Sequence, residues 1–331
     1  MSDVEETSTA QAPFDNPDSD IILRSSDGVN FHVFKLILSL ASPVFKDMFT
    51  LPQSQPDASS MHTIPMAESS TTLNSLLLLC YPTPNPTFSS LDDAIAVLEA
   101  ARKYDMAGTL SCASDVVMAQ FLATEPLQLY ALACRFGWKQ HARVAASRTL
   151  LIKDLVVGDP TSYQFAKMRD ITGLDYHRLI VYHYECGIAA KQVGESLAWL
   201  EPSSNNMQMW KCTRGGNCMR SNSNRTIQIA GVGKLKVTPW FDEYLVSSGN
   251  ELYAKPCQST IWTSISYNRA IVKAHECSEC RTTVFDSMDR FRTLYAGQVK
   301  KVIAMVSSGY LVSPLYHAYV LIHRWNWKLI D

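Results

Sequence analysis

The sequence contains no long hydrophobic run. Its apolar stretches, such as Leu76–Cys80, are far shorter than the roughly 20 residues that a transmembrane helix needs. The first twenty residues contain no hydrophobic segment of the kind found in secretory signals, and they are acidic instead. We therefore predict that the chain neither spans a membrane nor is exported, and we expect it in the cytoplasm or nucleus.

The short motifs of several large enzyme classes are also missing. The sequence has no P-loop, no G-x-G-x-x-G, no G-x-S-x-G and no H-E-x-x-H. The pair Gly231-x-Gly233 is too short to indicate phosphate binding. Catalytic groups that lie far apart in the sequence remain open, but nothing indicates a reaction, and we predict a protein that is not an enzyme. No internal repeat of 20–50 residues indicates a solenoid or propeller.

Charged residues are slightly scarce, at 18% against 47% hydrophobic residues, which is typical of a globular chain with packed cores. The length of 331 residues predicts about two domains. The net charge of −1 conceals an asymmetry, because residues 1–159 carry a balance of −8 and residues 160–331 a balance of +7. Two domains with different surfaces, or an anionic partner, would explain it.

Acidic residues are absent from residues 202–241, which carry six basic ones: Lys211, Arg214, Arg220, Arg225, Lys234 and Lys236. Such a stretch can contact an anion or nucleic acid. Aromatic residues for base stacking are found only near its ends. We interpret it as a solvated loop, with a nucleic-acid contact as the alternative.

Cysteine is present nine times, an odd number, which favours thiols or metal ligands over disulfides in a reducing compartment. Cys277-x-x-Cys280 has the spacing of a zinc knuckle, and Cys212 and Cys218 form a second, looser pair. Together the four thiols would make a structural zinc site.

Other residues leave this zinc prediction open. His275 or Cys257 could substitute for one of the four ligands, and the alternative is buried thiols beside Trp210, Trp240 and Phe285. The acidic neighbours Glu276 and Glu279 argue against thioredoxin-like chemistry, because they disfavour the thiolate.

Local signals predict the order of the elements. Residues 1–17 are polar and acidic, and we expect a disordered tail. Strands are predicted over residues 21–23, 29–33 and 63–66, the first two joined by a turn at Asp27-Gly28. Helices are predicted over residues 36–40, after the Ser42-Pro43 cap, and over 72–80, 89–106 and 116–122. Further helices are expected over residues 125–136, 139–151, 176–200 and 285–306.

Several of these segments contain short motifs in a fixed order. They are Asp20-Ile-Ile-Leu, Ser26-Asp-Gly28, Phe31-His-Val-Phe-Lys35-Leu-Ile-Leu38, Ser42-Pro-Val-Phe45, Met48-Phe49, Leu77-Leu-Leu-Cys80-Tyr-Pro82 and Ala100-Ala-Arg-Lys-Tyr-Asp-Met106. Together these motifs resemble the BTB/POZ domain. The sequences of these motifs are similar to those of BTB proteins from mushroom-forming basidiomycete fungi. We therefore predict an α+β chain with a BTB-like domain at residues 18–125, a helical extension at 126–159 and an α+β region of unknown type at 160–331.

The resemblance implies a small three-stranded sheet capped by helices, which usually dimerises. A domain of this size buries its own core only marginally, so a symmetric partner can cover the remaining apolar surface. We predict an interface on the first two helices, formed by Leu36, Leu40, Val44, Phe45 and Met48. The alternative is that these residues form the core of the monomer.

The resemblance also implies a charged pocket, formed here by Asp20 and Lys35. The pair is expected to be partly buried near the dimer axis, with a surface pair as the alternative.

Family members that recruit a cullin scaffold typically carry a hydrophobic-x-Glu signature before the third strand, and Thr50–Met61 contains no Glu.

We predict a protein-interaction module that forms a homodimer or pairs with another BTB domain and presents a C-terminal recognition surface. A cullin-linked ubiquitin-ligase adaptor and a transcription regulator are the alternatives. Copurification with a cullin would support the first, and salt-sensitive DNA binding the second.

Overall fold

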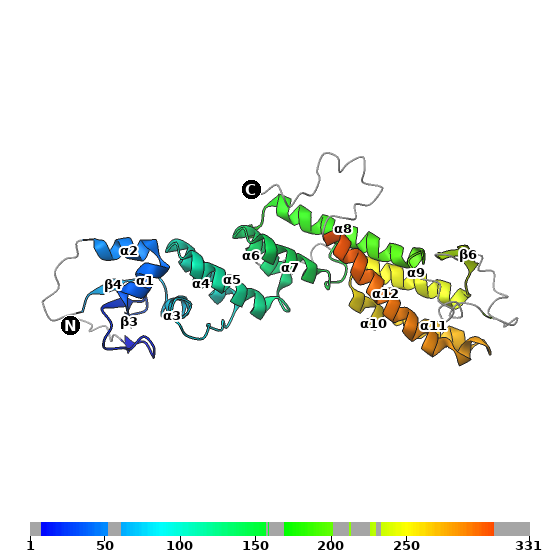
Figure 1. Cartoon of the computed structure of the whole chain (residues 1–331), viewed down its shortest axis with the longest axis horizontal. Coiled ribbons are helices and arrows are strands. Elements are labelled where there is room, and N and C mark those ends of the chain that lie inside the picture. Colours follow the sequence, from blue (N-terminus) through cyan, green and yellow to red (C-terminus); the bar gives the residue numbers. More distant parts are fainter. Residues whose placement is uncertain are drawn as a thin grey trace. The chain divides into compact units, whose positions relative to one another are not determined.

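The computed structural model describes residues 8–51, 61–156, 158, 169–200, 212, 226–229 and 233–307. The chain divides into two compact units, Met1–Glu125 and Pro126–Asp331, and each is coloured along the sequence in Figure 1. The α+β class is confirmed: a small mixed sheet with helices is followed by a largely helical region. No helix in the described part of the chain is long and apolar enough to cross a membrane.

The N-terminal unit is built on a four-stranded sheet, one strand more than predicted. Its strands, in the order in which they lie side by side, are β1 (Ser8–Thr9), β3 (Val29–Val33), β2 (Ile21–Arg24) and β4 (Thr63–Pro65). β2 and β3 are antiparallel, whereas β1 and β4 run parallel to their neighbours. The tight turn between β2 and β3 requires Gly28, whose φ of 84° is unfavourable for residues with a side chain.

The predicted disordered tail is wrong for residues 8–17. Phe14 is fully buried, and its ring lies 5.9 Å from Phe31 and 5.2 Å from Tyr81. Its carbonyl also accepts a hydrogen bond from the backbone N–H of His32. One buried aromatic ring therefore anchors a segment whose composition is otherwise that of a disordered chain. Residues 1–7 lie outside the described residues.

Helices cover this sheet and extend from it: α1 (Lys35–Ala41), α2 (Pro43–Thr50), α3 (Ser70–Leu78), α4 (Leu91–Lys103) and α5 (Ala107–Phe121). The predicted cap at Ser42 is confirmed, since its Oγ accepts from the N–H of Phe45 and Pro43 occupies the first turn. Ser90 caps α4 in the same way, with Asp92 and Asp93 in the first turn.

In the residues that the structure describes, the C-terminal unit is helical apart from one short hairpin. Its helices are α6 (Pro126–Arg135), α7 (Lys139–Thr149), α8 (Gly173–Glu195), α9 (Pro239–Ala254), α10 (Gln258–Thr263), α11 (Ile265–His275), the 3₁₀ turn η4 (Cys280–Thr282) and α12 (Val284–Ser307). The hairpin pairs β5 (Thr226–Ile229) with β6 (Gly233–Lys236). α8, α9 and α12 pack side by side (Figure 1).

An aromatic cluster fills the core of this bundle. Phe241 on α9 and Phe291 on α12 meet edge to face with ring centroids 5.0 Å apart, and Tyr295 packs 5.4 Å from Phe291. All three side chains are fully buried. Such edge-to-face contacts add to the free energy gained by burying the rings.

Candidate functional site

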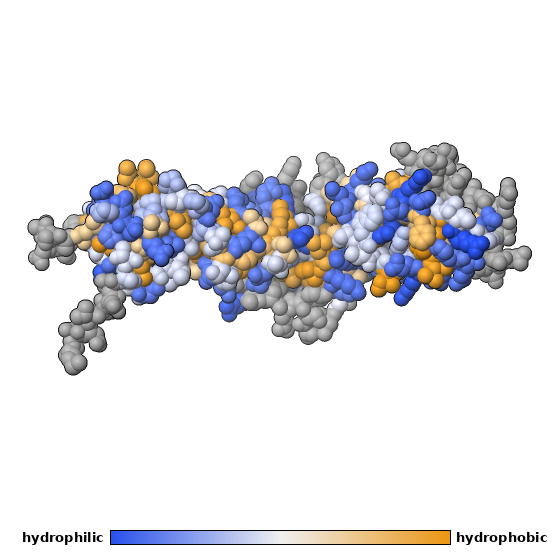
Figure 2. Space-filling view, turned by 90° about the horizontal axis from the view of Figure 1, so that it is seen from below, coloured by the Kyte–Doolittle hydropathy of each residue, from blue (hydrophilic) through white to orange (hydrophobic). Residues whose placement is uncertain are grey.

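Two leucines of α1 point away from the core of the N-terminal unit. Leu36 is 70% exposed and Leu40 is 81% exposed, whereas Leu38 between them is fully buried. Positions four apart lie on one helix face, so Leu36 and Leu40 are neighbours. Val44 at the start of α2 is 36% exposed. We call these three residues the α1 patch; hydrophobic side chains also protrude in Figure 2 from the part of the N-terminal unit where Figure 1 places α1 and α2.

The other two predicted interface residues differ in how far the structure buries them. Phe45 is fully buried, and its ring stacks on Tyr104 with centroids 4.8 Å apart. Met48 is half-buried. Phe45 therefore contributes to the core of its own unit, because the rotation from Val44 to Phe45 turns the side chain inward.

Asp20 and Lys35 lie together, but through a backbone contact. Oδ1 of Asp20 accepts a hydrogen bond of 2.7 Å from the N–H of Lys35, the first residue of α1. The N-cap residue Phe34 has no side-chain acceptor, so Asp20 supplies this cap from another part of the chain. Within the N-terminal unit Asp20 is exposed and Lys35 is half-buried.

Three of the four predicted metal ligands are brought together. The Sγ atoms of Cys212, Cys277 and Cys280 all lie within 4.8 Å of one another, and Cys212 Sγ is 3.7 Å from Cys277 Sγ. This group could hold a metal ion. The fourth predicted ligand, Cys218, lies outside the described residues.

The two predicted substitutes are not part of this thiol group. His275 Nδ1 lies 2.8 Å from the carbonyl of Ile271, one turn back on its own helix. Cys257 instead contacts the hydroxyl of Ser259, over 3.3 Å. The described thiols closest to metal-ligand geometry are therefore the three named above.

Sequence reasoning missed a cation–aromatic stack on the C-terminal unit. The guanidinium carbon of Arg292 lies 3.9 Å from the ring centroid of Tyr267 and 4.7 Å from that of Trp262. Arg292 also donates to the carbonyl of Trp262 over 3.0 Å. The three residues come from α12, α11 and α10, so no short motif could have revealed them.

This stack is accompanied by exposed hydrophobic surface. Trp262 is 45% exposed and Ile265, three residues later, is 65% exposed. Trp, Tyr and Arg are the residue types most enriched where protein interfaces gain their binding energy. We call Trp262, Ile265, Tyr267 and Arg292 the Arg292 stack.

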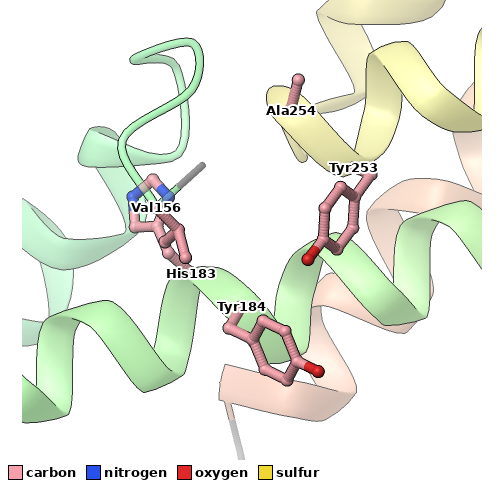
Figure 3. Close-up of a pocket in the computed structure, with 5 residues that line it drawn as sticks. All are labelled: Val156, His183, Tyr184, Tyr253 and Ala254. Atoms are coloured by element: carbon pink, nitrogen blue, oxygen red, sulfur yellow. The ribbon is translucent and has the colours of Figure 1, made fainter. Parts of the chain in front are cut away.

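A small hollow in the C-terminal unit is lined by Val156, His183, Tyr184, Tyr253 and Ala254 (Figure 3). His183 is buried, with Nε2 2.9 Å from the hydroxyl of Thr149. Burial lowers the pKa of His183 to about 4, so the ring is neutral at pH 7. The lining residues include no carboxylate or thiol that could work with this imidazole.

Of the six basic residues in the acid-free stretch, the structure describes two. Lys234 and Lys236 are both exposed and lie on β6. Lys211, Arg214, Arg220 and Arg225 lie outside the described residues. The predictions of a solvated loop or a nucleic-acid contact therefore both stay predictions.

Comparison with protein families identifies the class of the N-terminal unit. Residues 12–120 match the BTB/POZ domain family. The chain therefore contains a BTB/POZ domain, a module that mediates protein–protein interaction and dimerisation, over about a third of its length. The match begins inside the segment anchored by Phe14. No curated protein matches the chain.

Proposed function

We propose that this protein is a dimeric adaptor. Its BTB/POZ domain joins two copies through the α1 patch, and its C-terminal unit presents the Arg292 stack to a protein partner. The observation that supports this most directly is the pair Leu36 and Leu40, which remain 70% and 81% exposed on a helix whose opposite face is buried.

A second copy is the occupant that the α1 patch fits best. A two-fold contact brings the same surface together twice, so one dimer covers two copies of each leucine. Covering a largely exposed leucine contributes at least about 1 kcal/mol, so the four leucines contribute about 4 kcal/mol, which corresponds to roughly a thousandfold in affinity. BTB domains commonly dimerise, and the match over residues 12–120 includes all of α1.

The charged pair belongs to the same proposed interface. Asp20 binds the first turn of α1, the helix that carries Leu36 and Leu40. A partner helix placed over the α1 patch would remove water from Asp20 and Lys35. The two charges would then compensate each other at the edge of the contact.

The Arg292 stack is the proposed recognition surface of the C-terminal unit. Its guanidinium already contacts two rings and donates to the Trp262 carbonyl, so little side-chain entropy is lost when a partner binds. A matching partner would place an apolar side chain against Trp262 and Ile265. Beside it, a backbone or carboxylate oxygen would accept a hydrogen bond from a remaining N–H group of Arg292.

The test of dimerisation uses the full chain and its molar mass. Light scattering during size exclusion should give twice 37.0 kDa at micromolar concentration. The double variant Leu36→Asp/Leu40→Asp should give the single-chain mass with an unchanged circular dichroism spectrum. Val272→Asp is the matched control, because Val272 is 65% exposed but lies on α11. A wild-type chain that remains monomeric throughout this concentration range refutes the proposal.

Recognition by the Arg292 stack is tested separately. Proteins that copurify with the wild type are compared quantitatively with those that copurify with Trp262→Ala and with Phe285→Ala. Phe285 is 53% exposed and lies outside the stack, so it controls for general loss of hydrophobic surface. A specific partner should be lost with Trp262→Ala alone, while the dimeric mass is kept. Equal losses in both variants would contradict the assignment.

A further inference from the structure

We propose that the C-terminal unit binds a structural zinc ion through the thiolates of Cys212, Cys277 and Cys280. The proposal concerns the helical unit alone and does not depend on dimerisation of the BTB domain. It rests on the separation of the sulfur atoms, the backbone that holds two of them, and the distance in sequence of the third.

The sulfur separation matches a tetrahedral metal site. A Zn–S bond of ~2.3 Å places two sulfurs of a tetrahedron about 3.8 Å apart. Cys212 Sγ and Cys277 Sγ are 3.7 Å apart, and the whole group fits within 4.8 Å. A disulfide would instead require about 2.05 Å. Cys212 and Cys277 are thus at ligand spacing and not at bonding distance, and the sulfur of Cys280 lies within 4.8 Å of both.

The backbone holds Cys277 and Cys280 in a tight knuckle. α11 ends at its cap residue Glu276, and η4 begins at Cys280, so only Ser278 and Glu279 separate the two thiols. The N–H of Arg281 donates to the carbonyl of Cys277 over 3.1 Å and closes the turn. A C-x-x-C turn of this kind directs both sulfurs to one point, which is how zinc knuckles supply two ligands.

Burial makes these thiols suited to a structural ion. Cys277 is 2% exposed and Cys280 is 7% exposed, and both belong to the same core as Trp240 and Phe241. Buried thiols also occur as simple hydrophobic packing residues. Packing accounts for the pair in the knuckle, but it does not require a third thiol from 65 positions away to lie within 4 Å of one of them.

Zinc is the metal that this donor set favours. Thiolates are soft ligands that select zinc, copper(I) or iron–sulfur clusters over magnesium and calcium. Structural zinc sites are four-coordinate, so one further donor completes the site. Because the ion joins Cys212 to the end of α11, it would cross-link two parts of the chain and couple zinc binding to the folding of this unit.

The test measures metal in the full chain, purified without chelator. Elemental mass spectrometry should find about one zinc ion per chain. Replacement by Co²⁺ should give the intense visible absorption of tetrahedral thiolate coordination. Cys277→Ser/Cys280→Ser and, separately, Cys212→Ser should reduce bound zinc at least tenfold at equal free zinc. Cys257→Ser is the control and should keep its zinc, because Cys257 is in the same unit but outside the thiol group.

Folding of the variants is followed by circular dichroism. Cys212 is only half-buried, so its replacement removes little packing from the helical core, and a retained dichroism spectrum makes loss of zinc interpretable. Wild-type protein that neither contains zinc nor binds added Zn²⁺ or Co²⁺ overturns the proposal. So does copper or iron at this stoichiometry, or a native disulfide between Cys212 and Cys277.

Discussion

The carboxylate of Glu68 accepts a hydrogen bond of 2.6 Å from the hydroxyl of Tyr104, and its other oxygen binds the ammonium of Lys103 over 2.8 Å. The Glu68 side chain is only 10% exposed. Its backbone carbonyl also accepts from the N–H of Ser26. Glu68 therefore joins the turn after β2 and the segment before α3 to the end of α4, three parts of the BTB domain that are distant in sequence.

Glu68→Gln should destabilise the BTB domain by about 1–2 kcal/mol at pH 7, because a charged acceptor is replaced by a neutral one. The contribution of Lys103 is small, since its side chain is 51% exposed. Burial raises the pKa of Glu68, but the hydrogen bonds from Lys103 and Tyr104 outweigh it, and the pKa lies below its usual value of 4.5. Wild-type stability should therefore fall as the pH drops below about 4.5, and this dependence should be weaker in the variant.

The chain offers an internal control for this measurement. All seven tryptophans follow residue 125, so tryptophan fluorescence reports the C-terminal unit, while circular dichroism reports both units. During unfolding in urea, part of the circular dichroism change reports the BTB domain and is not accompanied by a change in tryptophan fluorescence. Glu68→Gln should shift this part of the transition to lower urea concentration. An identical shift in both signals would show that the effect is not confined to the BTB domain.

Sequence could predict the features of this domain that depend on neighbouring residues. The Asp27-Gly28 turn and the Ser42-Pro43 cap are short-range signals, and both are confirmed. Phe14 could not be predicted to be buried, because its partner Tyr81 is far away in the sequence and its neighbours are polar. The composition of the whole segment is polar, and it does not reveal that the ring of Phe14 is buried in the core.

For the candidate sites too, the sequence was informative about residues close together in the chain and less so about distant ones. The C-x-x-C spacing predicted that Cys277 and Cys280 would lie together. The sequence also grouped Cys212 with them, through its looser pair with Cys218, although the contact itself depends on the packing of the C-terminal unit. Helical periodicity correctly grouped Leu36 with Leu40 but could not separate the exposed Val44 from the buried Phe45. No sequence pattern indicated the Arg292 stack, because Trp262 and Arg292 lie 30 positions apart in the sequence.

Asp20→Asn should weaken the dimer while leaving α1 intact. Asparagine keeps an oxygen that can accept from the N–H of Lys35, so the helix cap survives and only the charge is lost. If the pair is buried at the dimer axis, Lys35 is left uncompensated, at a cost of ~3–5 kcal/mol. Light scattering should then show a lower mass, with a lower thermal midpoint. Asp18→Asn makes the same charge change at a nearby exposed position and should have no effect on the mass. An unchanged mass and midpoint in Asp20→Asn would remove the pair from the interface.

His183 should make the C-terminal unit sensitive to acid. Its usual pKa is 6.5, and burial lowers the pKa to about 4 in the folded unit. Between these values the unfolded chain is protonated and the folded unit is not, so stability is fully present above pH 6.5 and is lost as the pH falls to about 4. The loss is on the order of 3 kcal/mol.

The variant His183→Gln tests this assignment. Glutamine can hydrogen-bond the Thr149 hydroxyl and does not titrate, so fluorescence-detected unfolding should depend less on pH between 6.5 and 4. His177→Gln is the matched control, because His177 lies on the same helix and is exposed. Equal pH dependence in wild type and His183→Gln would assign the acid sensitivity to other groups.

Two glycines on helices of the C-terminal unit should respond in opposite directions to alanine. A Cβ at Gly187 on α8 would lie 2.9 Å from the carbonyl oxygen of Tyr253 on α9, and a backbone atom cannot move aside cheaply. Gly187→Ala should therefore destabilise the unit by about 1–3 kcal/mol.

A Cβ at Gly297 on α12 would meet no atom within 4 Å. Gly297→Ala should stabilise the unit by about 0.5–1 kcal/mol, since glycine inside a helix loses more backbone entropy than alanine. In a unit of this size each kcal/mol moves the midpoint by roughly 2–4 °C, so fluorescence-detected melting resolves the two shifts. A stabilising Gly187→Ala would show that α8 and α9 do not approach as closely as their glycine contact requires.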